Sequence, residues 1–147
     1  MSTMILFVGI QASGKTSFYK QFLREYTHVS LDVLNTRNKE RLAIEECIAS
    51  GRDFVVDNTN PTKEERKRYF DMIEGKNYRV IGYFFRSVIG ESIERNELRT
   101  GKQHVPKCAI ASTSKKLEIP NFEEGFHELH YVYIDNSGGF IVEEWRE

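Results

Sequence analysis

The sequence contains few of the features that mark disulfide-bonded, metal-binding or membrane proteins. Its two cysteines, Cys47 and Cys108, form no C-x-x-C pair, so we expect reduced thiols, as in a cytoplasmic protein. The four histidines show no metal-ligand spacing and are interpreted as structural. The first apolar run, residues 4–8, leads straight into a glycine-containing segment, so it is neither a signal peptide nor a membrane span. The composition therefore predicts a cytoplasmic protein that has no membrane partner.

An excess of charge of one sign is also lacking. The 21 Lys and Arg residues nearly balance the 22 Asp and Glu residues, which leaves a formal net charge of −1. A nucleic-acid partner would therefore need a local basic patch, because the field of the whole protein does not attract a polyanion. The 147 residues are 39% hydrophobic, enough for one compact domain with its own core, and they hold no internal repeat. We predict a single domain over residues 1–147.

Residues 9–16 read GIQASGKT, which matches the phosphate-binding loop G-x-x-x-x-G-K-[ST]. The apolar run before it predicts a buried strand, and residues 17–23 after it have apolar side chains at helical spacing. In this order the backbone N–H groups of the loop and the helix N-terminus point at an anion. We expect Lys15 to reach the outer phosphates of a nucleoside triphosphate and Thr16 to bind Mg²⁺. The expected nucleotide contacts in this segment are Gly9, Gln11, Ala12, Ser13, Gly14, Lys15, Thr16 and Ser17.

Strand-like and helix-like segments alternate along the rest of the chain. Strands are expected at residues 4–8, 29–31, 54–56, 79–85 and 129–134. Helices are expected at residues 34–50, 62–74 and 88–99, and the polar, basic residues 101–106 are expected to form a mobile flap. This alternation predicts an α/β protein with a mainly parallel sheet of about five strands and helices on both faces. Together with the phosphate loop it indicates the P-loop NTPase fold with a small lid.

Two acidic residues follow predicted strands, at the edge of the sheet where ligands bind in such folds. Asp57 follows residues 54–56, and an acid there can hold Mg²⁺; alternatively, Asp57 and Asn58 only cap a turn. Asp32 ends the second strand, where a carboxylate could accept the proton of an attacking hydroxyl. The alternative is that Asp32 only caps the next helix. The residues alone leave both choices open.

Basic side chains near the flap are candidates for contact with a transferring phosphate. Arg95 and Arg99 share one helix face, and Lys102 follows in the flap. Arginines in such a place stabilise the charge that spreads over the phosphoryl oxygens in the transition state. For Arg95 the alternative is an ion pair with Glu91, one turn earlier. The basic run at residues 63–68 is interleaved with acids and is interpreted as a solvated helix face rather than a nucleic-acid site.

Together these residues resemble the kinase domain of the 5′-hydroxyl polynucleotide kinases. The resemblance covers residues 4–134 and is carried by four stretches: the phosphate loop, residues 55–62 (VVDNTNPT), residues 95–99 with 104–106 (RNELR and HVP), and residues 116–120 with 124–126 (KLEIP and EGF). The sequence Asp-Asn-Thr-Asn after the third strand is the most diagnostic of them. The resemblance implies an ATP-dependent kinase that uses Mg²⁺ and acts on 5′ ends of RNA or DNA.

The resemblance also implies roles for individual residues. Asp32 matches the general base, Arg99 the arginine that engages the transferring phosphate, and Arg95 a second lid arginine. The catalytic set is then Asp32, Arg99 and Lys15, and the metal ligands are Thr16 and Asp57. The expected acceptor contacts are Asp32, Arg37, Asn58, Asn60 and Lys102.

The sequence departs from the family in two places. Asn35 stands where family members often have an arginine after the general base, with Arg37 and Arg41 nearby, and no Asp-x-Asp-x-Thr phosphatase signature occurs. Three hypotheses therefore stay open: a polynucleotide 5′-kinase, a kinase for a nucleoside, sugar or antibiotic, and a nucleotide-binding module without transfer. The sequence makes no prediction of oligomeric state.

Overall fold

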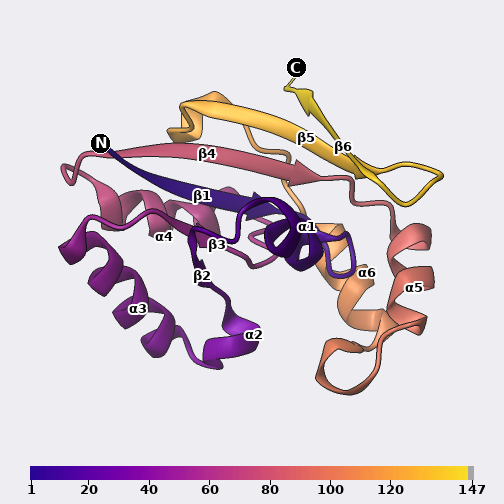
Figure 1. The fold of residues 1–147 in the computed structure, drawn as a ribbon. Coiled ribbons are helices and arrows are strands. Elements are labelled where there is room, and N and C mark those ends of the chain that lie inside the picture. Colours follow the sequence, from indigo (N-terminus) through magenta and orange to yellow (C-terminus); the bar gives the residue numbers. More distant parts are fainter. Residues whose placement is uncertain (146–147) are drawn as a thin grey trace.

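The chain folds around one six-stranded sheet, seen in a computed structural model that describes residues 1–145, apart from the side chain of Lys102 (Figure 1). The strand order is β2-β3-β1-β4-β5-β6, in which the first five strands run parallel and β6 runs antiparallel to β5. The strands are β1 (Ser2–Val8), β2 (Thr27–Val29), β3 (Phe54–Val56), β4 (Tyr78–Phe85), β5 (Glu128–Ile134) and β6 (Phe140–Glu144). The α/β class and the mainly parallel sheet are confirmed.

Helices connect the parallel strands. They are α1 (Lys15–Phe22), α2 (Leu31–Leu34), α3 (Arg37–Ser50), α4 (Lys63–Ile73), α5 (Ile89–Glu97) and α6 (Lys107–Lys116). Two 3-10 turns, η1 (Gly101–Gln103) and η2 (Phe122–Glu124), complete the chain described. Within residues 1–145 no helix has the length and apolar character needed to cross a bilayer. The exposed Cys108 lies on α6, and the buried Cys47 lies on α3.

The second strand and the helix after it differ from the prediction. The strand expected at residues 29–31 ends at Val29, and residues 31–34 form the short helix α2. The helix expected over residues 34–50 begins only at Arg37, because Asn35 has a left-handed backbone (φ 71°) that interrupts it. The Thr36 side chain then accepts a hydrogen bond from the Lys39 N–H and caps α3.

The central strand β1 separates two apolar layers. One side of the sheet packs on α3 and α4, and its core includes Leu6, Ile44 and Tyr69. The other side packs on α1, and its core includes Phe7 and Phe18. Because side chains alternate along a strand, a strand between two helical layers must be apolar throughout. This explains why residues 4–8 are all buried and why the phosphate loop after them starts from a rigid support.

Two elements, β6 and α6, were not predicted. Residues 140–144 form a hairpin with β5 through a turn in which the Asp135 carboxylate accepts from the N–H groups of Ser137 and Gly139. Phe140 of β6 packs edge-on against Phe18 of α1, with ring centroids 5.3 Å apart. The sixth strand therefore supports the helix that follows the phosphate loop.

The basic run at residues 63–68 is not solvated throughout. The Arg66 side chain is fully buried: it forms an ion pair with Glu124 (2.7 Å) and donates to the Asn60 carbonyl (2.9 Å). A helix of 11 residues that packs on the sheet must turn one side inward, and Arg66 lies on that side with Tyr69 and Ile73. The solvated-face interpretation is wrong for this residue, which instead joins α4 to η2.

We predict that Arg66→Met lowers the free energy of unfolding by about 3–5 kcal/mol, because it leaves the largely buried Glu124 carboxylate without its ion-pair partner. Arg68→Met, at an exposed position of the same helix, is the control and should change the stability by no more than about 0.5 kcal/mol. Urea unfolding measures both variants. Equal stabilities of the two variants would contradict the prediction, and adding Glu124→Gln to Arg66→Met should restore part of the loss.

Candidate active site

The phosphate loop links β1 to α1 in a conformation that its residue types allow. Gly14 (φ 99°) and Ala12 (φ 58°) both have left-handed backbones, which glycine adopts freely and alanine only at some cost. A Cβ at Gly9 would lie 3.0 Å from both the Phe85 Cβ and the Ser13 Oγ, so only glycine fits there without displacement. The loop therefore has the tight turn that an anion cradle requires.

Lys15 is held inside this loop. Its side chain is buried, and the Nζ donates to the Ile10 carbonyl at 2.8 Å. Burial lowers the pKa of Lys15 to about 8, an effect that the nearby Asp57 carboxylate partly offsets. A buried cation with few compensating charges is stabilised when an anion binds beside it. The position of Lys15 therefore fits the predicted contact with phosphate.

The Asp57 carboxylate lies at the carboxyl end of β3 and meets two neighbouring elements. Its Oδ2 accepts from the Thr16 hydroxyl at 2.7 Å and lies 2.8 Å from the His28 Nε2 of β2. The His28 ring is stacked on Tyr19, with centroids 4.1 Å apart. Sequence reasoning treated His28 as structural and did not place it in the site. The sequence carried no signal for this position, because His28 lies outside the strand expected at residues 29–31 and the pairing of β2 with β3 is seen only in the structure.

The donor set at Thr16 and Asp57 is suited to Mg²⁺, which prefers hydroxyl, carboxylate, phosphate and water oxygens. No cluster of three or more His, Cys, Asp or Glu side chains that could hold a metal occurs in the part of the chain described. A magnesium ion at this place would therefore take its other ligands from phosphate and water, as Mg²⁺ usually does with nucleotides. The two residues fit the ion.

Asp32 does not end a strand, as the sequence suggested, but lies in the first turn of α2. The turn is positioned by Asn58, whose Oδ1 accepts from the Leu31 N–H at 2.9 Å. Asp32 lines a cleft of about 240 Å³ together with Lys15 and Arg99. The other residues that line this cleft are Gln11, Ala12, Thr16, Leu31, Arg37, Asp57, Asn58, Thr59, Asn60, Pro61, Glu65, Gln103 and Val105. Despite the shift in secondary structure, Asp32 faces the phosphate loop.

The two lid arginines reach the site from α5 and its C-terminal end. Arg95 donates to the Ala12 carbonyl of the phosphate loop (3.3 Å) and also lies 3.6 Å from the Glu91 carboxylate, so the ion pair given as its alternative role is present, and its contact with phosphate stays a prediction. Arg99 donates to the Gln103 carbonyl at 3.2 Å. Partial burial lowers the pKa of Arg99, and this is opposed by the nearby carboxylates of Asp32 and Asp57. The predicted role of Lys102 lies outside the part of the structure described.

The predicted acceptor residues Arg37, Asn58 and Asn60 all line the cleft. Arg37 is half-exposed, and its Nη1 donates to Glu40 (3.0 Å) and to the Tyr69 hydroxyl (2.9 Å). The Asn58 amide donates to the same two groups, and the buried Asn60 amide donates to the Phe7 carbonyl (2.7 Å). The two asparagine amides therefore hold the loop after β3 in place, while Arg37 is accessible to a ligand.

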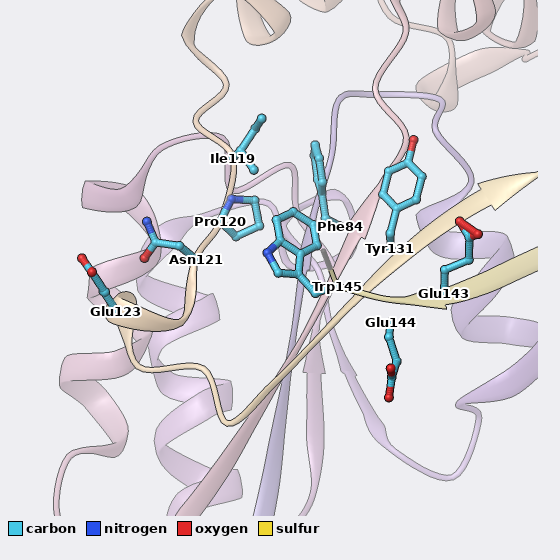
Figure 2. Close-up of a pocket in the computed structure, with 9 residues that line it drawn as sticks. All are labelled: Phe84, Ile119, Pro120, Asn121, Glu123, Tyr131, Glu143, Glu144 and Trp145. Atoms are coloured by element: carbon cyan, nitrogen blue, oxygen red, sulfur yellow. The ribbon is translucent and has the colours of Figure 1, made fainter. Parts of the chain in front are cut away.

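Of the cavities that lie outside this cleft, two bear on the choice of the reaction site. One, of about 440 Å³, lies beside Arg95 and is lined by Arg86, Glu91, Arg95, Tyr133, Ile134, Asp135 and Asn136. The other, of about 660 Å³, shares no residue with the phosphate cleft. Figure 2 shows the rings of Phe84, Tyr131 and Trp145 gathered there beside Ile119 and Pro120. Its larger volume does not make it the reaction site, because the phosphate loop and the acidic residues of interest lie elsewhere.

Comparison with known proteins agrees with this geometry. A family model described as an AAA domain matches residues 4–120. The bifunctional polynucleotide phosphatase/kinase of Schizosaccharomyces pombe is 26% identical over 136 residues, which cover 88% of this chain and 33% of that protein. The putative bifunctional polynucleotide phosphatase/kinase of Acanthamoeba polyphaga mimivirus is 28% identical over 148 residues, which cover 91% of this chain and 34% of that protein. The chain therefore spans about a third of the length of these relatives.

Among solved structures, a gluconokinase from Sinorhizobium meliloti 1021 superposes with a TM-score of 0.64 at 20% sequence identity, covering 89% of this chain and 82% of that one. At this identity the likeness is one of fold. It confirms the α/β P-loop kinase fold that the sequence predicted.

We predict that Lys15→Met stabilises the nucleotide-free protein at pH 7 by up to roughly 3 kcal/mol, since it removes a buried charge. In the native protein the pKa of Lys15 is lower in the folded state than in the unfolded state. The energetic penalty of burying its charge is therefore present below about pH 8 and disappears as the pH rises toward the ordinary pKa of lysine. The stability difference between the two proteins should therefore shrink between pH 7 and pH 10 in urea unfolding. A difference that is independent of pH would contradict the prediction.

Proposed function

Because this chain belongs to the AAA domain family and has the P-loop kinase fold, we propose that it is a Mg²⁺-dependent kinase that transfers phosphate from ATP to the 5′-hydroxyl end of RNA or DNA. The observation that carries the proposal is the convergence of Asp32, Lys15 and Arg99 on one cleft. A carboxylate, a buried cation and a lid arginine are the groups that phosphoryl transfer to an alcohol requires.

The transfer follows from these positions. The loop N–H groups and Lys15 bind the outer phosphates of ATP, and the cleft admits the 5′-hydroxyl beside Asp32. The 5′ oxygen forms a bond to the γ-phosphorus while the bond from that phosphorus to the β–γ bridging oxygen breaks. Asp32 accepts the hydroxyl proton, and ADP leaves. Mg²⁺ bound at Thr16 and Asp57 would supply positive charge beside the phosphate oxygens.

The lid completes the charge around the transferring group. Arg99 lies near Asp32 and Asp57, where it stabilises negative charge on the phosphoryl oxygens. Arg95 contacts the phosphate loop and also lines the 440 Å³ cavity beside the turn after β5. Because this cavity lies next to the phosphate loop, we assign it to the base and ribose of the nucleotide. Lys102 stays a predicted acceptor contact.

Support for a polynucleotide acceptor comes from the two relatives, whose names identify both as polynucleotide phosphatase/kinases. The second candidate is a kinase for a small acceptor such as a nucleoside, sugar or antibiotic. The net charge near zero, the small cleft volume and Asn35 in place of an arginine favour it. A nucleotide-binding module that transfers no phosphate would not need Asp32 and Arg99 in the same cleft as Lys15.

We expect Asp32→Asn and Arg99→Ala each to reduce the rate of label transfer from ATP to a 5′-hydroxyl oligonucleotide by at least about 10²-fold. Both should keep a near-native melting temperature, since both side chains line an open cleft. Asp71→Asn, an equivalent substitution at an exposed position of α4, is the control and should retain full activity. Full transfer activity in Asp32→Asn would remove the general base from the mechanism.

Salt dependence distinguishes the two kinase candidates. An acceptor bound through several phosphates releases counterions, so KM for an oligonucleotide should rise steeply between about 50 and 200 mM salt. A small neutral acceptor should show almost no change. Transfer to a nucleoside, sugar or antibiotic combined with no transfer to RNA or DNA oligonucleotides would replace the first proposal by the second.

A further inference from the structure

A second cleft adjoins the phosphate cleft and shares one residue with it. This cleft, of about 490 Å³, is lined by residues of α3 and α4: Arg37, Asn38, Glu40, Arg41, Arg68 and Met72. Arg37 also lines the phosphate cleft, where Asp32 lies. The two clefts therefore meet at the Arg37 side chain, and a ligand that extends from Asp32 past Arg37 enters the space between α3 and α4.

The lining of this α3–α4 cleft is strongly basic although the chain as a whole is not. Three arginines line it, against one carboxylate, Glu40, in a protein with a net charge of −1. The Glu40 side chain is buried, and its oxygens already accept from Arg37, Asn58 and Tyr69. The Glu40 carboxylate is therefore already bound by groups of the protein itself. The electrostatic potential at the surface of the cleft is determined by the arginines.

Arg41 and Arg68, like the half-exposed Arg37, are available to an external anion. Arg41 pairs with Glu45 at 2.7 Å, but both side chains are about half exposed (51% and 52%), so this pair contributes little and is easily exchanged. Arg68 is exposed and has no ion-pair partner within the described part of the chain. Guanidinium groups bind phosphate oxygens in a bidentate manner and also stack on nucleobases, so this lining suits a chain of nucleotides.

We propose that the α3–α4 cleft binds the sugar-phosphate backbone of a single-stranded nucleic-acid acceptor, on the 3′ side of the nucleotide whose 5′-hydroxyl lies at Asp32. The proposal rests on the proposed function and specifies the path of its substrate. Arg37, at the junction, meets the phosphate nearest the reacting end, and Arg41 and Arg68 meet phosphates further along. The aliphatic stems of the arginines and Met72 provide apolar surface for the bases.

The test compares a long and a short acceptor. Arg68→Glu should raise KM for a 12-nucleotide 5′-hydroxyl oligonucleotide at least tenfold and should leave kcat and the KM for ATP unchanged. The same variant should phosphorylate a nucleoside 3′-monophosphate, which is too short to reach Arg68, like the native protein. The slope of the logarithm of the binding constant against the logarithm of the salt concentration should become less steep by about one, because one phosphate contact is lost.

Lys76→Glu is the matched control. It makes the same change of charge at an exposed residue in the turn between α4 and β4, at the amino end of β4, and Lys76 lines neither cleft. It should leave KM for both acceptors unchanged. Arg41→Glu is a second variant of the cleft and should behave like Arg68→Glu.

Fluorescence anisotropy with a labelled 12-mer separates failure of this inference from failure of the proposed function. Should the native protein transfer phosphate to the 12-mer while Arg68→Glu and Lys76→Glu behave alike, the acceptor path is wrong and the kinase assignment stands. Binding of the 12-mer that depends on Arg68, without any transfer, supports the path and overturns the kinase function. Neither binding nor transfer with the native protein overturns both.

Discussion

The hydrogen bond between the Thr16 hydroxyl and the Asp57 carboxylate joins the two parts of the chain on which the site depends. Thr16 is the last residue of the phosphate-loop motif and lies in the first turn of α1, and Asp57 follows β3. The bond can form because β1 and β3 are parallel neighbours, with Leu6 opposite Val56, so their carboxyl ends lie side by side. A second link, from the Gly9 N–H to the Thr59 carbonyl (3.0 Å), fixes the two loops at the same edge. The acidic residues and the anion cradle consequently face one cleft.

The segment formed by α5, η1 and α6, which we call the lid, is connected to the same loop by polar contacts. The Gln11 amide donates to the Thr113 hydroxyl of α6 at 2.9 Å, and Arg95 of α5 donates to the Ala12 carbonyl. Within the lid, the Asn96 side chain both donates to and accepts from the backbone of Val105 (2.6 and 3.0 Å). Figure 1 shows α5 and α6 next to one another beyond the carboxyl ends of the strands. Gln11 and Arg95 therefore link the phosphate loop directly to the lid.

The parts of the fold that the sequence predicts well are those in which burial determines the pattern. Residues 4–8 and 54–56 are buried throughout, because a parallel strand covered on both faces must be apolar, and residues 79–85 and 129–134 also lie within observed strands. The phosphate loop can be recognised in the sequence for a different reason. Its glycines allow the tight turn of the backbone, and Lys15 supplies a positive charge. The similarity to the two relatives was anticipated from residues 55–62, which include the Asp57 and Asn58 side chains that connect neighbouring elements.

Other parts depend on contacts that a linear pattern does not contain. The edge strand β6 buries no residue fully, and α6 buries only Ile110 and Thr113, so neither has a clear periodic signal. Asp32 reaches the cleft from a single helical turn, which is held by the hydrogen bond from the Leu31 N–H to Asn58, 27 positions further along the chain. His28 lies beside Asp57 only because β2 pairs with β3. The residues next to His28 in the sequence do not indicate which strand β2 pairs with. The roles of Asp32 and Arg99 stay predictions until their variants are measured.

The placement of the two thiols gives the lid a natural attachment point for a spectroscopic probe. Cys108 is exposed on α6, the helix that Thr113 links to the phosphate loop, whereas Cys47 is enclosed between α3 and the sheet. A maleimide fluorophore would thus modify the lid selectively in the unaltered sequence. Its emission would report how α6 approaches the rest of the molecule during turnover, with no cysteine added or removed.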